Sequence, residues 1–359
     1  MPPPSNLRSS PGIDIHRGIA VILMFLAHAW RMQSSSTSAN PFLWIDRTLR
    51  ELDRGVAYVA ASFLFLAGYS LVLARNSSTQ SNFCFFLGIL RRSGWLYLIA
   101  ILMFIAEHGT DLPDLAASPG ILSMIAVALV ITSAGILCPR PILALASISI
   151  TVVTATFILE SLGYAVSGLN SGPGGAIPLI AYSTLGAICA ILQMGQRTRS
   201  LMVIAAASFP VFIFALLSSS SWLALYPSTY SYHGGLAIAS LLGFGANHSG
   251  HIVRVFWNPS TIGTIGLVFP VLLTTTVLVS LERIPLMLRL CRPVLKLGRH
   301  SLLAFLAHYA LLGSAELCQF KPSHGGWTLS MTLILTLTCW GAAEIFDRIR
   351  RRCADRSTH

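Results

Sequence analysis

Charged side chains are scarce in this chain of 359 residues, of which only 10% are Asp, Glu, Lys or Arg. Soluble domains carry about a quarter charged residues, so this scarcity argues against a soluble globular protein. Hydrophobic residues instead make up 54% of the chain, and the mean hydropathy is +0.70. The apolar runs have the length of membrane-spanning helices, and the alternating pattern of a membrane β-barrel is missing. The composition therefore predicts an all-α, polytopic integral membrane protein.

Recognisable metal, disulfide and phosphate-loop patterns are also missing. The seven cysteines stand singly, with no spacing typical of a zinc site or a disulfide framework, and are interpreted as small apolar residues. His248 and His251 are three residues apart, as metal ligands can be, but no acidic residue accompanies them. The glycine-rich stretch 171–175 lacks the Gly-Lys-Ser/Thr of a phosphate-binding loop. We therefore predict no bound metal.

The formal net charge of +11 does not indicate nucleic-acid binding, because the basic residues gather in short loops between apolar runs. The basic connections are 75–93, 138–140, 193–200, 282–299 and the C-terminal tail. They alternate along the chain with connections poor in Lys and Arg: 107–119, 159–175, 218–235 and 318–327. Basic loops stay on the cytoplasmic side of a membrane. The pattern predicts a plasma-membrane protein, of the bacterial inner-membrane kind, with both termini in the cytoplasm.

The apolar runs predict about ten transmembrane helices. Their expected ranges are 13–32, 56–74, 83–106, 120–137, 142–162, a run ending at 192, 201–217, 262–281, 301–317 and 327–346. A further apolar segment, 235–246, is too short to cross and suits a re-entrant or interfacial piece.

Three parts of the chain follow from these ranges. Residues 1–12 are rich in Pro and Ser, and we expect a disordered cytoplasmic N-terminus there. Residues 13–347 are expected to form a single transmembrane domain. Residues 348–359 are expected to form a basic cytoplasmic tail.

The first span carries polar residues that are unusual inside a membrane. Arg17 and His28 are eleven positions apart, which returns them to within about 20° of the same helix face. The rise of a helix separates them by about 16 Å along its axis. Asp14 lies one turn before Arg17 and can pair with it. Because such groups are costly in lipid, we expect this stripe to face protein or a water-filled cavity.

Other polar residues interrupt or border the later apolar runs. Arg91–Arg92 lies within the third run, and Glu107 and His108 lie at its end. His308 falls near the middle of the ninth run. A polar residue at such a depth marks either a functional site or a satisfied internal hydrogen bond.

Each of these residues has a purely structural alternative. His28 and His308 could be packed, hydrogen-bonded histidines. Arg17 and Arg91–Arg92 could be anchors that orient the helices. Glu107 and His108 could belong to a solvated loop.

Four motifs resemble a known superfamily. The first is Asp14-x-x-Arg17-Gly18, followed after ten residues by His28. The others are the Phe-rich segment 63–69 with its Gly-Tyr end, Leu90-Arg91-Arg92, and the Leu-Gly-x-x-Ser…His pattern over 297–308. Together they resemble the transmembrane acyltransferase superfamily, which includes the acyltransferase-three and heparan-α-glucosaminide N-acetyltransferase-like families.

The resemblance implies an activity and a donor. It implies transfer of an acyl group, acetyl in the first instance, from acyl-CoA to a hydroxyl or amine of an extracytoplasmic glycan or glycoside. Acetyl-CoA would be the donor substrate, with no metal. The expected partners are the acyl-CoA, a carbohydrate acceptor and membrane lipids, and no nucleic acid.

The resemblance also assigns roles to residues. His28 would act as general base or, alternatively, as a transient acyl carrier. Arg17 would bind the donor and be held by Asp14, and Arg91–Arg92 would bind its phosphates. The residues expected to line the site are Glu107, His108, Ser301 and His308.

Two functions from other classes remain as alternatives. A secondary transporter or flippase for a small polar or lipid-linked solute would show paired discontinuous helices in corresponding halves, and the sequence shows none. A non-catalytic membrane scaffold would tolerate the loss of His28.

Overall fold

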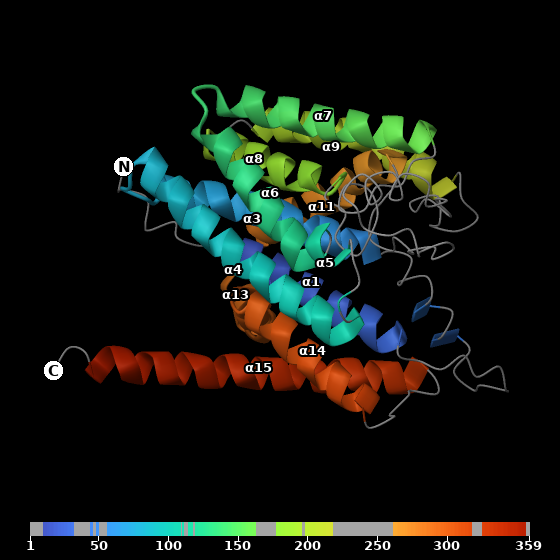
Figure 1. Cartoon of the computed structure of the whole chain (residues 1–359), viewed down its shortest axis with the longest axis vertical. Coiled ribbons are helices and arrows are strands. Elements are labelled where there is room, and N and C mark those ends of the chain that lie inside the picture. The colour runs from blue at the N-terminus through green and yellow to red at the C-terminus, as the bar shows by residue number, and fades with distance from the viewer. Residues whose placement is uncertain are drawn as a thin grey trace. The chain divides into compact units, whose positions relative to one another are not determined.

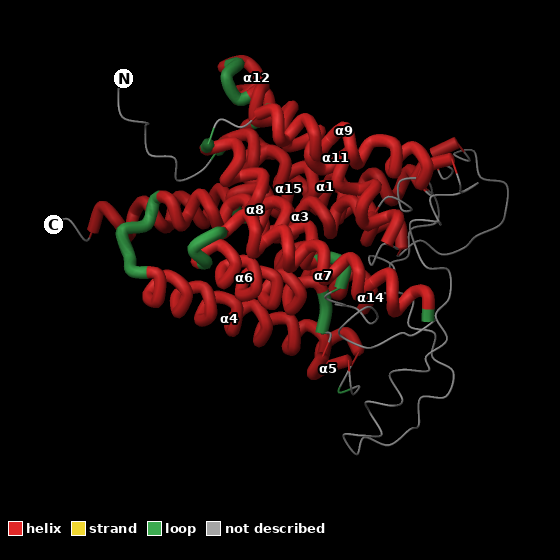
Figure 2. The backbone as a smooth tube through the Cα atoms, turned by 90° about the horizontal axis from the view of Figure 1, so that it is seen from above, coloured by secondary structure: helices red, strands yellow, loops and turns green. Residues whose placement is uncertain are grey.

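The computed structural model describes residues 10–31, 44–45, 48–49, 56–108, 110, 114–117, 119–162, 177–195, 198–217, 261–317 and 325–356. Within these ranges the regular structure is helical, with no strand (Figure 2). The predicted all-α class is confirmed. The expected re-entrant segment 235–246 and the predicted N-terminal segment up to residue 9 lie outside the described residues.

Seven described segments are long and apolar enough to cross a membrane. They are α1 (Pro11–Arg31), α3 (Val56–Asn76), α4 (Asn82–His108), α6 (Ile121–Leu137) with the preceding α5 (Asp114–Ala117), α7 (Pro141–Ser161), α11 (Thr261–Leu281) and α15 (Gly325–Arg356). Three shorter apolar helices lie at the other predicted spans: α8 (Ile180–Met194), α9 (Thr198–Leu217) and α14 (Ser301–Leu317). The chain is thus an integral membrane protein, and the count of ten crossings stays a prediction.

The helices differ most from the predicted ranges in two places. The basic connection 282–299 contains two short helices, α12 (Pro285–Leu290) and α13 (Arg292–Arg299). Each begins with a proline in its first turn, where the missing N–H is harmless. The last helix continues to Arg356, through most of the predicted basic tail, because Arg and Ala are good helix formers.

The chain divides into two compact units, whose helices are labelled in Figure 1. The middle unit contains residues 60–273, and the terminal unit contains residues 10–59 and 274–359. The single domain predicted over 13–347 stays a prediction.

Glycines bring two helices of the middle unit together. A Cβ on Gly68 of α3 would overlap the carbonyl of Ser183 on α8, and a Cβ on Gly186 of α8 would overlap the carbonyl of Phe65. The hydroxyl of Tyr69 donates to Oε1 of Gln193 at 2.8 Å across the same pair of helices. Small residues allow this approach in membrane proteins, so the Gly68 motif acts as a packing element.

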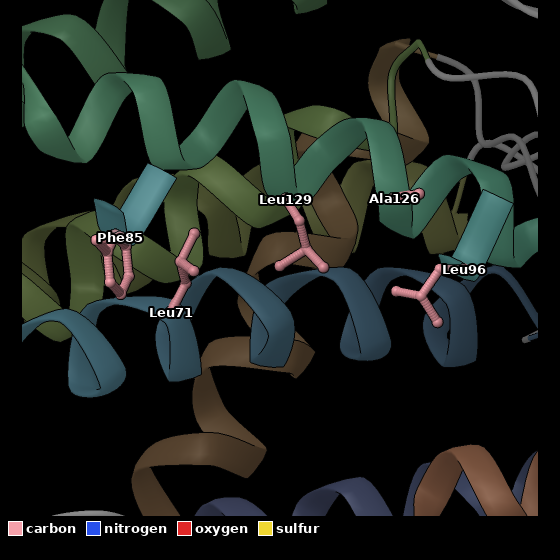
Figure 3. Packing of buried hydrophobic residues seen from close by; sticks show 5 residues of the cluster. All are labelled: Leu71, Phe85, Leu96, Ala126 and Leu129. Atoms are coloured by element: carbon pink, nitrogen blue, oxygen red, sulfur yellow. The ribbon is translucent and has the colours of Figure 1, made fainter. Parts of the chain in front are cut away.

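An apolar cluster holds α3, α4 and α6 of the middle unit together. Its members, shown in Figure 3, are Leu71, Phe85, Leu96, Ala126 and Leu129. In this view the labelled side chains lie in the layer between the ribbons of α3 and α6.

The terminal unit is built around α1. The carboxylate of Glu282 accepts hydrogen bonds from Oγ of Ser10 at 2.6 Å and from the backbone N–H of Gly12 at 2.8 Å. It thereby satisfies the start of α1, where unpaired N–H groups and the helix dipole favour an anion. Helices α13, α14 and α15 pack against the remainder of α1.

Candidate active site

The polar stripe of α1 contains two separate side-chain clusters in the terminal unit. Because α1 is helical without a break from Pro11 to Arg31, Arg17 and His28 share a face about 16 Å apart along the axis. We call the cluster around Arg17 the arginine end and the cluster around His28 the histidine end.

At the arginine end a single carboxylate bridges two guanidinium groups. Nη1 of Arg17 donates to Oδ1 of Asp14, and Nε of Arg299 donates to Oδ2, each at 3.2 Å. Nη1 of Arg17 also lies 3.4 Å from the carbonyl oxygen of Gly298. The Asp14 side chain is only 6% exposed. A nearly buried carboxylate is thus paired with two cations, as a buried charge requires.

Close packing of α1 against α13 creates this cluster. A Cβ on Gly298 would overlap the carbonyl of Asp14, and a Cβ on Gly18 would overlap the carbonyl of Val294. The two backbones therefore touch at glycines on both helices. This contact places Arg299 beside Asp14 although 285 positions separate them in the chain.

At the histidine end two imidazole rings meet. Nδ1 of His28 and Nε2 of His308 are 3.0 Å apart, which is a hydrogen bond. Tyr309 meets the His28 ring edge-on at 5.5 Å between centroids, and Phe25 and Phe305 lie 5.0 Å and 5.3 Å from the His308 ring. His308 is fully buried and His28 is half-buried. The aromatic rings thus fix the orientation of the pair.

The second nitrogen of His308 has a distinct surrounding. Nδ1 is buried and makes no hydrogen bond within the described residues. The ring of His308 is therefore held through Nε2 and by its aromatic neighbours.

A third polar network surrounds His16 on α1. Nδ1 of His16 lies 3.0 Å from Oγ1 of Thr275, and Nε2 lies 3.1 Å from the hydroxyl of Tyr58. That hydroxyl donates to Oγ1 of Thr274 at 3.0 Å. His16 is fully buried. The network joins α1 to the first turn of α3 and the last turns of α11, which is a structural role.

Ionic contacts also attach α13 to α15. Lys296 pairs with Glu344 and lies 3.4 Å from Oδ2 of Asp347. Nε2 of His300 lies 2.9 Å from Oδ1 of Asp347. Lys296 and His300, four positions apart, thus point toward α15, whereas Arg299 points toward α1.

The predicted site residues have different outcomes. Asp14, Arg17, His28 and His308 all take part in the two clusters of the terminal unit. Ser301 is the first residue of α14 and is half-buried. Their predicted roles in binding and catalysis remain predictions.

The other predicted residues lie on α4. Arg91 and Arg92 are exposed in the middle part of this helix, in the middle unit. Glu107 and His108 are its last residues, and their side chains lie outside the described residues. Across the described ranges, no three His, Cys, Asp or Glu side chains gather as they would around a metal ion.

Sequence reasoning missed Arg299 and Tyr309 as members of the two clusters. The sequence contains a signal for Arg299. In the first span a cation, Arg17, precedes a histidine, and Arg299 likewise precedes His308 by nine positions. The signal for Tyr309 was weaker, because a tyrosine beside a histidine has no distinctive spacing.

These observations define a helical membrane protein in which α1 contributes Arg17 to a pair of cations and His28 to a pair of imidazoles. Residues 10–226 match the family described as heparan-alpha-glucosaminide N-acetyltransferase, catalytic. The match covers more than half of the chain, so the chain belongs to this family of transmembrane acyltransferases, and the membership indicates acetyltransferase activity. No curated protein matches the sequence. The matched range includes Asp14, Arg17 and His28, whereas Arg299 and His308 lie beyond it.

Proposed function

We propose that the chain transfers an acetyl group from acetyl-CoA to an amine or hydroxyl of an extracytoplasmic glycan, with His28 as the general base. The observation that carries the proposal is the arrangement along α1, where Arg17 lies beside Arg299 of α13 and His28, about 16 Å further along, lies beside His308 of α14. Family membership supports the acetyltransferase chemistry.

The arginine end suits the donor. Two guanidinium groups lie there on one carboxylate, and guanidinium is the side chain best matched to phosphate geometry. The phosphates of CoA would bind there, and its flexible arm would extend along α1 toward the histidines. Arg91 and Arg92 on α4 are further candidates for phosphate binding.

The histidine end suits the acceptor. In this proposal Nε2 of His308 accepts a hydrogen bond from Nδ1–H of His28, and the proton of His308 is on its Nδ1. Nε2 of His28 then carries the lone pair that a general base needs. His308 is in this account a positioning residue, since it fixes the tautomer and ring orientation of His28.

The transfer step balances with these groups alone. Nε2 of His28 takes the proton as the acceptor oxygen or nitrogen attacks the thioester carbonyl, and the new C–O or C–N bond forms. The C–S bond then breaks, and the leaving thiolate of CoA takes the proton back from His28. In the alternative route Nε2 of His28 attacks the thioester carbonyl, and the C–S bond breaks to release the CoA thiolate. The acceptor then attacks the acetyl group, the bond from Nε2 to the acetyl carbon breaks, and the thiolate takes the acceptor's proton.

The loop charges supply the direction. Basic loops on the cytoplasmic side would place Arg17 near the cytoplasm and His28 near the outer surface. Donor and acceptor would then approach from opposite sides of the plasma membrane.

The test uses the purified chain in lipid nanodiscs with labelled acetyl-CoA and a glucosamine-terminated glycan. Wild-type protein should release CoA and form acetylated product, and His28→Ala should reduce the rate by at least about 10²-fold, the usual contribution of a general base. Arg292→Gln is the control, because Arg292 lies in the same unit, is exposed, and has no ion pair with a described residue. An unchanged rate in His28→Ala would exclude the proposed mechanism.

The transport alternative has a separate readout. Uptake of an unmodified solute into vesicles, unaffected by His28→Ala and without release of CoA, would favour a transporter or flippase.

A further inference from the structure

Arg299 is held at one nitrogen and exposed at the others. Its Nε donates to Oδ2 of Asp14, and the side chain is 51% exposed. Within the described part of the chain, its two terminal nitrogens make no hydrogen bond. The guanidinium therefore presents a fork of N–H donors from a fixed base.

The other cations of α13 are arranged differently. Lys296 is 13% exposed and is paired with both Glu344 and Asp347 on α15. Arg292, two turns before Arg299, is exposed, and no ion pair joins it to a described residue. Arg299 is thus the cation of α13 that combines an anchored guanidinium with exposed donors.

One carboxylate orients both arginines. Asp14 contacts Arg17 through Oδ1 and Arg299 through Oδ2. Two guanidinium groups held on one carboxylate are already oriented, so less side-chain entropy is lost when an anion binds. A phosphate group matches the charge and the planar donors of the exposed Arg299 guanidinium.

The backbone contact makes this arrangement rigid. Gly298 precedes Arg299 and touches the Asp14 carbonyl, and Arg17 reaches the Gly298 carbonyl from α1. An arginine on a surface loop without such contacts would not have its guanidinium held in one position. The cluster therefore has the features of a built anion site on two helices.

We propose that Arg299 binds a phosphate group of the acyl-CoA donor together with Arg17, with Asp14 as the residue that positions both. This inference rests on the proposed acetyl-CoA-dependent function. It assigns a donor-binding residue outside the part of the chain that matches the family. It also makes the phosphates of the donor, rather than its thioester alone, a determinant of substrate choice.

The test compares donors with and without phosphate in Arg299→Gln, using the full chain in nanodiscs. The KM for acetyl-CoA should rise at least about tenfold, with kcat little changed, because a charge-assisted hydrogen bond made in the bound state is lost. The KM for acetyl-pantetheine, which has no phosphate, should stay the same. Arg292→Gln is the matched control and should leave both KM values unchanged.

Binding of CoA alone, measured by calorimetry, gives a readout that needs no acceptor. Arg299→Gln should weaken CoA binding at least about tenfold, and Arg299→Lys should recover part of the loss because it keeps the charge without the planar fork. Acetyl-dephospho-CoA lacks the ribose phosphate, so a comparison with acetyl-CoA shows which phosphate of the donor Arg299 contacts. If Arg299→Gln loses the preference for acetyl-CoA over this analogue, Arg299 contacts the ribose phosphate, and if the preference remains, it contacts the diphosphate.

Failure of the inference is distinct from failure of the function. Wild-type protein that neither binds CoA nor forms product would contradict the proposed function and this inference together. Wild-type activity with an unchanged KM for acetyl-CoA in Arg299→Gln would overturn the inference alone. An equal rise in KM for acetyl-CoA and acetyl-pantetheine would also overturn it, since that result indicates a general structural defect.

Discussion

A hydrogen bond joins the two residues at the histidine end. Of Nδ1 of His28 and Nε2 of His308, one must donate and the other accept, so the protonation of the two rings is coupled. The aromatic rings of Phe25 and Phe305 keep His308 in place. In the proposed mechanism, His308 positions His28.

The residue-scale prediction concerns His308. His308→Ala should lower kcat by about 10- to 100-fold, the range typical of losing a partner that orients a reactive imidazole. The KM for acetyl-CoA should change little, because the arginine end is intact. Steady-state kinetics of the His308→Ala and His308→Gln variants measure both quantities.

Comparison of the two variants separates positioning from packing. Gln has an amide oxygen that can accept from His28, so His308→Gln should keep more activity than His308→Ala. Equal loss in both variants, together with a lowered melting temperature, would indicate that His308 serves only to fill the core.

The packing of α13 against two other helices, α1 and α15, explains how the arginine end is assembled. The α1–α13 contact depends on glycines at the crossing, and the ionic contacts of Lys296 and His300 hold the opposite side of α13 on α15. Helix α13 is therefore fixed on two sides. These contacts hold the basic side chains of this short helix in fixed positions beside α1.

The element-scale prediction concerns Gly18. Gly18→Val would overlap the Val294 carbonyl and force α13 away from α1. We expect weaker CoA binding and a lower melting temperature in the same variant, since the crossing supports both. Gly313→Val is the control, because a Cβ at Gly313 of α14 meets no atom within 4 Å.

Calorimetry with CoA and thermal unfolding in detergent are the two measurements for this prediction. CoA binding at the wild-type level in Gly18→Val would contradict the role given to the crossing.

The sequence predicts the positions of the helices better than the side-chain contacts between them. Hydropathy located α1 and α14 to within a few residues, because apolar run length is a local property. The contacts of Asp14 with Arg299 and of His28 with His308 join positions 285 and 280 apart, and no periodicity encodes them. The contact of Asp14 with Arg299 follows from helix packing at Gly18 and Gly298.

The helices in charged segments were not predicted from the sequence. The stretch 282–299 and the residues after 346 were expected to be a loop and a tail because hydropathy falls there. Amphipathic or charged helices need no apolar run, so α13 and the end of α15 were missed.

The whole molecule is expected to separate donor and acceptor across the membrane. Single cysteines at two exposed threonines test this topology: Thr79, after α3, and Thr110, after α4. The exposed native Cys84 and Cys138 must first be replaced. In intact cells, an impermeant maleimide should label Thr110→Cys and should label Thr79→Cys only after permeabilisation.

The opposite labelling pattern would place Arg17 on the outer side. Cytoplasmic acetyl-CoA could then not reach the arginine end, and the proposed direction of transfer would be wrong.

The central claim is that the two ends of α1 divide donor binding from chemistry. The most direct measurement compares CoA binding and labelled acetyl transfer in His28→Ala and Arg17→Gln. His28→Ala should bind CoA as the wild type does and form almost no product. Arg17→Gln should bind CoA at least about tenfold more weakly and retain turnover at saturating donor. Normal product formation by His28→Ala, or unchanged CoA affinity in Arg17→Gln, would contradict the account.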